Sequence, residues 1–187
     1  MRFCRFTTED GPARWGIVES SAVVAVEGDV FSRYGASSEI FPREEVTLLA
    51  PVQPSKIIAL GTNFRLHAEE MGRPLPEQPK IFFKPPSALI GHGAAIRLPD
   101  VEGNVDFEAE VALVIGKRCR HVESSQALDC VFGYTCFNDV TARALQRMDG
   151  VFARAKGFDT FAPAGPWIET DALWEDLELH GRGNGET

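Results

Sequence analysis

The segment that most constrains the fold is VDFEAEVALVIG, residues 105–116, where two glutamates stand two positions apart beside an apolar run. Read as a strand, it places Val105, Phe107, Ala109, Val111, Leu113 and Ile115 on one face. Glu108 and Glu110 then share the opposite face, where their like charges repel unless a positive group lies between them. Because the neighbouring sequence is apolar and expected to be buried, these carboxylates should be paired or should bind a metal ion.

A third carboxylate is expected to join this pair. Asp139 stands at the end of the strand predicted for YTCFNDV, 29 residues after Glu110. Three carboxylates without a nearby His or Cys cluster favour magnesium or manganese over zinc. The sequence therefore predicts Glu108, Glu110 and Asp139 as ligands of Mg²⁺ or Mn²⁺. The plainer alternative for an isolated E-x-E pair is a solvated sheet edge.

A histidine and a glutamate form a second candidate group. His67 and Glu70 stand three positions apart in RLHAEEM, a segment of helical composition. On a helix they share a face, so that the carboxylate can orient the imidazole and raise its basicity. That is the geometry of a general base, although an isolated pair of this kind is also typical of a helix surface.

Four further polar residues each have a functional and a plainer interpretation. Lys156, in ARAKGFDTF, can polarise a carbonyl or hold a substrate carboxylate, or it is an exposed loop lysine. Arg143, just after Asp139, suits a carboxylate substrate or a surface ion pair, and Gln146 could add a donor. Lys84, before two prolines, is equally ambiguous, and its plainer interpretation is a side chain that snorkels to water.

Composition excludes several classes of partner. A net charge of −8 and a pI near 5.0 argue against a general grip on nucleic-acid phosphates. No apolar run approaches the roughly 20 residues that span a bilayer, and the N-terminal residues lack the apolar region of a signal peptide. We therefore expect a cytoplasmic protein that binds neither nucleic acid nor membrane. The four scattered cysteines should be reduced and mostly buried.

The order of predicted elements indicates a strand-dominated α+β fold. Residues 1–50 alternate as a small β-rich N-terminal module, and Pro51 and Pro54 mark its boundary with residues 51–187. Beyond the boundary the patterns predict strands at 56–60, 80–84, 94–99, 105–115, 134–139, 165–170 and 177–181. Short helices are expected at 65–71, within 124–134 with a cap at Ser124 or Ser125, and at 141–148.

Five blocks in order give the chain a resemblance to a known family. They are GTNFRLHAEEMG, KIFFKPPSALIGHG, VDFEAEVALVIG, GYTCFNDVTAR and RAKGFDTFAPAGPWI. Together, from about Lys56 to Ile168, they resemble the fumarylacetoacetate hydrolase family. The resemblance implies a mixed β-roll, a homodimer, and a magnesium-type ion held by Glu108, Glu110 and Asp139.

The resemblance also implies roles for the other candidates. His67 and Glu70 would activate water or shuttle a proton, Lys156 would lie near the metal, and Arg143 and Gln146 would bind substrate. Two departures stand out. Ala144 replaces the acidic residue that commonly follows the family's arginine, and the family's further C-terminal strands and T-G-T-P-x-G loop are missing. The domain over 51–187 is therefore expected to be truncated at its C-terminus.

The function expected from the sequence is that of a Mg- or Mn-dependent enzyme acting on a small 2-oxo acid or diketo acid. Hydrolysis of a C–C bond, decarboxylation and isomerisation share a metal-stabilised enolate, and the sequence does not choose among them. One alternative is a protein that binds the metal and the oxo acid but is catalytically impaired. Another is a fragment that completes its sheet by exchanging strands with a second copy.

Overall fold

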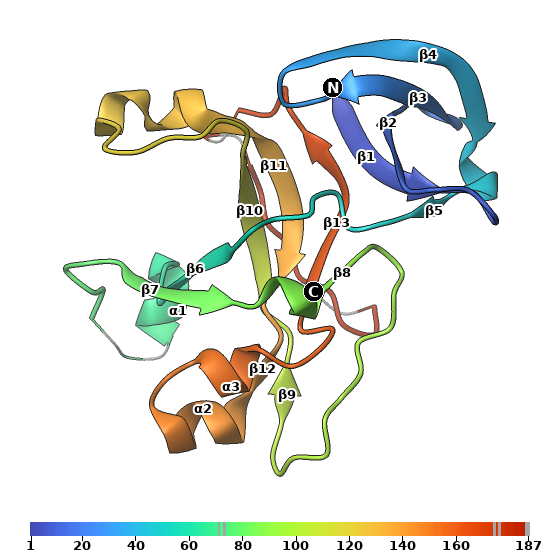
Figure 1. Cartoon of the computed structure of the whole chain (residues 1–187). Helices are drawn as coiled ribbons and strands as arrows, with labels where there is room; N and C mark the ends of the chain where they lie inside the picture. Colours follow the sequence, from blue (N-terminus) through green and yellow to red (C-terminus); the bar gives the residue numbers. More distant parts are fainter. Residues whose placement is uncertain (71, 73, 174, 176, 186–187) are drawn as a thin grey trace.

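The largest sheet of the protein joins its N-terminal and later strands. The computed structural model describes residues 1–70, 72, 74–173, 175 and 177–185, without the side chains of His67 and Glu70. Over these residues the sheet has nine strands (Figure 1). Seven lie in the order β10 (Ala109–Ile115), β11 (Val131–Asn138), β13 (Ala162–Glu169), β1 (Arg2–Thr7), β2 (Arg14–Val18), β3 (Ala22–Asp29) and β4 (Arg33–Pro42). Of the other two, β5 (Thr47–Leu48) pairs with β1, and β8 (Leu89–Ile90) pairs with β13. The predicted strand-dominated α+β class is confirmed.

Alternating apolar residues build the core of the N-terminal strands. Cys4 and Phe6 of β1 are fully buried against Val23 and Ala25 of β3. β2 pairs antiparallel with β3, and a short turn joins the two strands. On its other edge β1 pairs antiparallel with β13, so the first fifty residues share a sheet with the later part of the chain.

The strand predicted for residues 105–115 is interrupted. β9 (Val105–Asp106) pairs with β12 (Thr141–Ala142), whereas β10 pairs with β11, and Phe107 and Glu108 lie between the two ladders. The register is nevertheless the same on both sides. Asp106 lies opposite Thr141. Ala109, three residues after Asp106, lies opposite Asn138, which is three residues before Thr141. The alternation of faces therefore continues across the gap.

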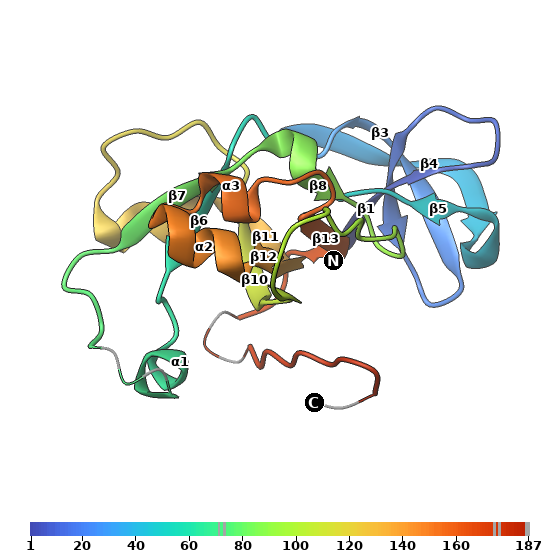
Figure 2. The ribbon, with the colours of Figure 1, turned by 90° about the horizontal axis from the view of Figure 1, so that it is seen from below.

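Helices are short and lie outside the sheet. They are α1 (Arg65–Glu70), α2 (Arg143–Asp149) and α3 (Ala153–Lys156), with 3₁₀ turns at Arg43–Glu45, Pro86–Ala88 and Ser124–Cys130. Figure 2 shows α2 and α3 side by side close to β12, while α1 stands away from them. The helix predicted from Thr141 begins two residues later because Thr141 and Ala142 pair with β9. The predicted serine cap is wrong, since the turn at Ser124 has no side-chain capping bond.

Three other sequence predictions are wrong. Among the described residues, 94–99 form no strand, because the Arg97 N–H donates to Thr160 Oγ1 at 2.8 Å rather than to a neighbouring strand. Residues 177–181 form none either, and Gly181 packs against Phe107 instead. All four cysteines are free as expected, but only Cys4 is buried.

A separate two-stranded sheet, formed by β6 and β7, leaves one apolar face open. β6 (Ile57–Gly61) pairs with β7 (Lys80–Lys84), which puts Ile58 opposite Phe83 and Leu60 opposite Ile81. These four side chains share a face, and each is more than 40% exposed. On the other face Phe82 packs edge-on against Phe152 of the segment before α3. β6–β7 therefore contributes only one of its faces to the core.

The expected apolar face of β10 is also partly open. Phe107, Leu113 and Ile115 share one side as predicted, yet each is more than half exposed. Within residues 177–185, Gly181 and Gly183 lie close to Phe107, so the C-terminal segment covers only the start of this face. None of the described helices is both long and apolar enough to cross a bilayer.

Packing of β11 on β13 gives a direct test of this sheet. A Cβ added at Gly133 would lie 2.5 Å from the Glu169 carbonyl oxygen and 2.7 Å from Ile168 Cγ2. Gly133→Ala should therefore lower the free energy of unfolding by about 1–3 kcal/mol, because the two strands must separate. In β4, Gly35 has open space around it, so Gly35→Ala is the matched control and should change stability by less than about 0.5 kcal/mol. Equal denaturation midpoints for the two variants would contradict the pairing.

Candidate active site

The interruption between β9 and β10 places two carboxylates opposite each other. The Asp139 N–H donates to the Glu108 carbonyl oxygen at 3.0 Å, and the Glu108 N–H donates to Asn138 Oδ1 at 3.0 Å. Asn138 thus takes the bond that the ladder leaves open. Since the register is unchanged, Glu108 and Asp139 face each other across the strands, and Glu110 lies on the same face two residues on.

The ammonium group of Lys156 bridges the two facing carboxylates. Its Nζ lies 2.7 Å from Glu108 Oε2, 2.5 Å from Asp139 Oδ2 and 2.7 Å from Thr141 Oγ1. Lys156 is only 3% exposed, so the exposed-loop interpretation is wrong. The rings of Phe82 and Phe152 lie 5.2 and 5.9 Å from the same nitrogen. The ammonium of Lys156 is therefore largely shielded from water.

Lys84 is the residue whose role the sequence did not resolve. It is 1% exposed, and its Nζ lies 2.5 Å from Asp139 Oδ1 and 3.3 Å from the Val140 carbonyl oxygen. The snorkelling interpretation is therefore wrong. Burial lowers the pKa of the Lys84 amine, and the charge of Asp139 opposes this shift. One signal was present in the sequence, because alternation along β7 puts Lys84 on the same face as Phe82.

Arg143, at the start of α2, closes the site on its other side. Its Nε lies 2.8 Å from Asp106 Oδ2, and its Nη1 lies 2.6 Å from Glu108 Oε1 and 3.0 Å from Gln146 Oε1. Burial would lower the pKa of Arg143, but the bonds and charges of Asp106 and Glu108 outweigh it and raise the pKa. The guanidinium thus finds carboxylate partners although its neighbour is Ala144.

The two glutamates differ in charge environment. Burial works against ionisation of Glu108, yet the bonds and charges of Lys156 and Arg143 bring its pKa below the ordinary value. At Glu110 burial, with the nearby charges of Asp139 and Glu108, raises the pKa to about 7. Among the described residues, no hydrogen bond or ion pair engages the Glu110 carboxylate. It is therefore the one member of the trio that still lacks a positive partner there.

The donor set suits a hard divalent ion. Three carboxylates share one face of the strands, and oxygen ligands of this kind are those that Mg²⁺ and Mn²⁺ prefer. In the described part of the chain, however, no three acidic, His or Cys side chains already stand as a group that could hold a metal. The Lys156 ammonium lies where Glu108 and Asp139 need positive charge. The residues thus fit the ion by chemistry, with Lys156 as their present counter-ion.

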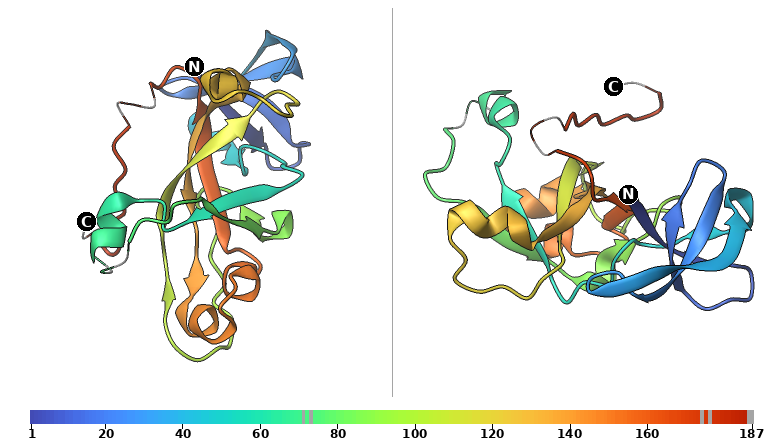
Figure 3. Two further views of the ribbon diagram at one scale, coloured as in Figure 1. Left: turned by 90° about the vertical axis from the view of Figure 1, so that its left-hand side faces the viewer. Right: turned by 90° about the horizontal axis from the view of Figure 1, so that it is seen from above.

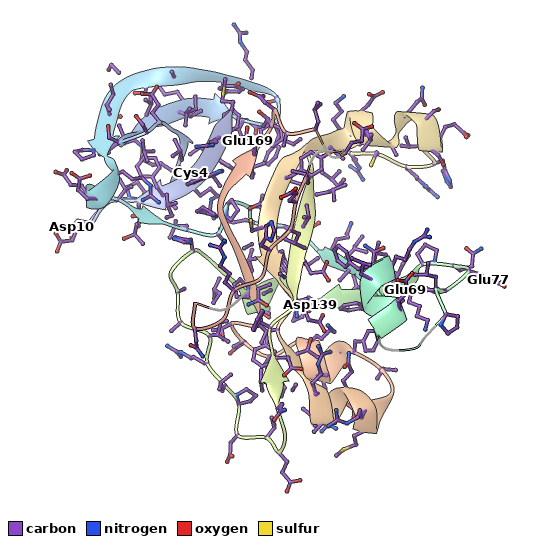
Figure 4. The ribbon with its side chains drawn as sticks, turned by 180° about the vertical axis from the view of Figure 1, so that it is seen from behind. Cys4, Asp10, Glu69, Glu77, Asp139 and Glu169 are labelled. Carbon is purple, nitrogen blue, oxygen red and sulfur yellow. The ribbon has the colours of Figure 1, made fainter. Side chains whose placement is uncertain are left out.

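Both side chains of the predicted His67–Glu70 dyad lie outside the described part of the protein. The backbone of α1 stands away from the main sheet in both views of Figure 3. Figure 4 shows Asp139 at the centre of the molecule, where β11 ends, and Glu69 on α1 off to one side. The structure thus brings together six of the predicted side chains, which are Glu108, Glu110, Asp139, Arg143, Gln146 and Lys156.

Comparison with known proteins identifies the family. The sequence pattern described as "Fumarylacetoacetate (FAA) hydrolase C-terminal" matches residues 56–187, and "Rv2993c-like, N-terminal" matches residues 1–51. The first match covers well over half of the chain. The protein therefore belongs to the fumarylacetoacetate hydrolase family, and the resemblance seen in the sequence is confirmed.

Three relatives have names that state an enzymatic activity. The crystal structure of a 5-carboxymethyl-2-hydroxymuconate delta-isomerase from Mycobacterium smegmatis is 39% identical, with a TM-score of 0.84, over 92% of this chain and 68% of that one. A maleylpyruvate hydrolase from Sphingobium, in complex with manganese(II) and pyruvate, is 30% identical, with a TM-score of 0.70, over 91% and 67%. The Homo sapiens "Oxaloacetate tautomerase FAHD2A, mitochondrial" is 38% identical over 157 residues, 81% of this chain and 50% of that protein. The named relatives are thus enzymes of oxo-acid chemistry. The chain spans between 50% and 63% of the length of eight curated relatives that it matches.

The raised pKa of Glu110 predicts how stability depends on pH. A carboxyl whose folded-state pKa is about 7 instead of 4.5 favours the folded state at low pH, and this contribution is lost as pH rises between those values. Without divalent ions, Glu110→Gln should therefore melt above the unmodified chain at about pH 8, and the gap should narrow toward about pH 5. Glu27→Gln, at an exposed strand position, is the control and should show no such gap. A gap for Glu110→Gln that widens at low pH would contradict the assignment.

Proposed function

We propose that this chain carries the site of a Mg²⁺- or Mn²⁺-dependent enzyme that acts on a small 2-oxo acid or diketo acid. The observation that carries the proposal is the charge cluster itself. Glu108 and Asp139 face each other, Glu110 lies beside them, and Lys156 and Arg143 reach the same carboxylates. Such a concentration of partly buried charge is characteristic of a functional site rather than of ordinary packing. The names of the family relatives supply the class of substrate.

Glu108, Glu110 and Asp139 are the residues proposed to hold the ion. When bound, a divalent ion supplies a Lewis acid that polarises a 2-oxo group and favours the enolate form. Glu110 supports this role because, among the described residues, no ion pair or hydrogen bond already engages its carboxylate. Glu108 supports it because its low pKa keeps it ionised and ready to act as a ligand.

Lys156, Arg143 and Gln146 are proposed to bind the substrate. The Lys156 ammonium is held by two carboxylates, and it can turn to the carboxylate of an oxo acid once other positive charge satisfies Glu108 and Asp139. Phe82 and Phe152 keep water from this nitrogen, which strengthens each charge interaction made there. Arg143 offers a planar guanidinium, with Gln146 at its side.

His67 and Glu70 are proposed to move the proton. In this reading the Glu70 carboxylate orients the imidazole, and His67 activates water or exchanges a proton with the enolate carbon. The segment that carries them, α1, stands away from the carboxylates, so it would have to approach when substrate binds. Hydrolysis of a C–C bond, decarboxylation and isomerisation all remain compatible with these roles.

Charge balance implies that the ion and the acid bind together. With every group ionised, the site has four carboxylates, from Asp106, Glu108, Glu110 and Asp139, and three cations, from Lys84, Arg143 and Lys156. The net charge of these groups is therefore −1, and a divalent ion alone would change it to +1. A dianionic acid bound with the ion would return the net charge to −1, so each ligand should increase the affinity for the other.

Metal binding should appear as a gain in thermal stability. An ion that binds only the folded state raises its free energy of unfolding, by about 2.7 kcal/mol at a concentration of 100 Kd. We therefore expect MgCl₂ or MnCl₂ to raise the melting temperature of the unmodified chain and of Glu27→Gln, with a larger rise when oxalate is added. In Glu110→Gln the rise should be lost, because one ligand charge is gone. A metal response in Glu110→Gln equal to that of the control would remove Glu110 from the site.

Turnover should depend on the dyad. Oxaloacetate, acylpyruvates and hydroxymuconate-type diacids are the substrates to screen, each with Mg²⁺ and with Mn²⁺. On any substrate that is turned over, His67→Ala should reduce kcat by about 10²–10⁴. His180→Ala, at an exposed position in the C-terminal segment, should leave it unchanged. Unchanged turnover in both His67→Ala and Glu108→Ala would refute the catalytic assignment.

One observation favours a second candidate function. Because α1 stands apart from the carboxylates, the chain could bind the ion and an oxo acid without completing a catalytic site. Oxalate binding that requires Mg²⁺, with no product from any substrate over long incubation, would support this catalytically impaired protein. Clear product formation would dismiss it.

Assembly and location complete the proposal. We propose a homodimer, supported by the open apolar face formed by Ile58, Leu60, Ile81 and Phe83. The molar mass in light scattering tests it, and Ile81→Asp should shift a dimer toward monomer.

The division into a module over residues 1–50 and a catalytic part over 51–187 is kept as a proposal, as is a cytoplasmic location without nucleic-acid or membrane partners.

A further inference from the structure

We propose that the buried charge of Lys84 sets the ligand preference of this site, weakening the binding of a free divalent ion and strengthening that of a dianionic acid. The inference rests on the proposed function and adds a residue to it. Lys84 would act through Asp139 and through its field, without touching either ligand. It is thus a positioning and specificity-determining residue rather than a catalytic one.

Two observations show that Lys84 is committed to the site. Its side chain is wholly buried, and its Nζ contacts one oxygen of Asp139 while Lys156 contacts the other. Its second contact is the Val140 carbonyl oxygen, one residue further along. The carboxylate of Asp139 is therefore fixed from both sides, and one of its two oxygens is kept on Lys84.

The two lysines differ in how readily each ammonium can give up its carboxylate partners. Lys156 also contacts Glu108 and Thr141, so its ammonium is shared among several acceptors of the site. Among the described residues Lys84 has Asp139 as its only carboxylate partner within ion-pair distance. Moving Lys84 away would leave a buried ammonium without a counter-ion, which costs far more than exchanging a shared contact. Lys84 is accordingly the fixed charge and Lys156 the exchangeable one.

The sign of the effect follows from charge. With Lys84 present, the site holds one more carboxylate than cation, so a divalent ion overshoots neutrality and a dianion is drawn in. Without that charge the excess would be two carboxylates, and a divalent ion alone would balance it. Loss of the Lys84 charge should therefore favour the ion and disfavour the acid. A lysine that served only packing would weaken both ligands together or neither.

The test uses Mn²⁺ and oxalate as probes of the whole 187-residue chain. Isothermal calorimetry would measure Mn²⁺ alone, and oxalate at saturating Mn²⁺, for the unmodified chain, Lys84→Met and Lys84→Arg. In Lys84→Met, Mn²⁺ should bind about tenfold more tightly and oxalate about tenfold more weakly, the size of effect expected for one nearby unit charge. Lys84→Arg keeps the charge and should show neither opposite shift.

Other outcomes overturn the inference. Equal affinities in Lys84→Met and the unmodified chain, or a loss of both ligands in Lys84→Met and Lys84→Arg alike, would reduce Lys84 to packing. If the unmodified chain binds no Mn²⁺, the proposed function fails, and the role of Lys84 fails with it. Binding by the unmodified chain with no effect at Lys84 overturns only the present inference.

A further variant, Lys84→Gln, covers the case in which Lys84→Met does not fold. Glutamine removes the positive charge but keeps an N–H donor for Asp139, whose other oxygen keeps its contact with the Lys156 ammonium. In Lys84→Gln, Mn²⁺ should bind more tightly and oxalate more weakly than in the unmodified chain. Equal affinities in Lys84→Gln and the unmodified chain would refute the role of the Lys84 charge.

Discussion

The structure of the site depends on one cross-strand pair, in which Glu108 and Asp139 lie opposite each other on two antiparallel strands. The unchanged register on both sides of the β9–β10 interruption leaves their side chains no other arrangement. Two partly desolvated carboxylates cannot remain so close without positive charge. Lys156 from α3 and Arg143 from α2 supply it, and both short helices are held beside β12 by the buried apolar cluster that contains Ala142, Leu145 and Ala155.

Much of this arrangement could be predicted from the sequence because it follows from alternation. The period of two put Glu108 and Glu110 on one face, and the end of the next strand supplied Asp139. The interruption at Phe107 and Glu108 was not predictable, since it depends on the side chain of Asn138 replacing a ladder bond. Local patterns contain no information about such a distant acceptor.

Lys84 shows why the rest of the site could not be predicted from local sequence patterns. A lysine before two prolines resembles any strand end, and only the pairing of β7 with β6 carries it to Asp139. The strand predicted for residues 94–99 failed for a similar reason, because Thr160 takes the N–H that a strand would need. In both places a contact between residues more than fifty positions apart overrides the local signal.

The two buried lysines of the site have different electrostatic roles, one as a fixed charge and the other as an exchangeable one. Buried Lys84 holds Asp139 in place, whereas Lys156 satisfies the same carboxylates in a way that other positive charge can replace. Glu110 has no ion-pair partner among the described residues, and burial, together with the charges of Asp139 and Glu108, raises its pKa. A site of this kind is held in shape by some of its charges and kept ready for a ligand by the others.

The central claim is that Glu108, Glu110 and Asp139 together form a divalent-ion site. A crystal of the chain grown with MnCl₂, with diffraction data collected near the manganese absorption edge, tests this most directly. The account predicts one strong anomalous peak within bonding distance of oxygens from all three carboxylates, with the Lys156 ammonium displaced from Glu108. A manganese-saturated crystal without anomalous signal there, and with Lys156 still bridging Glu108 and Asp139, would contradict it.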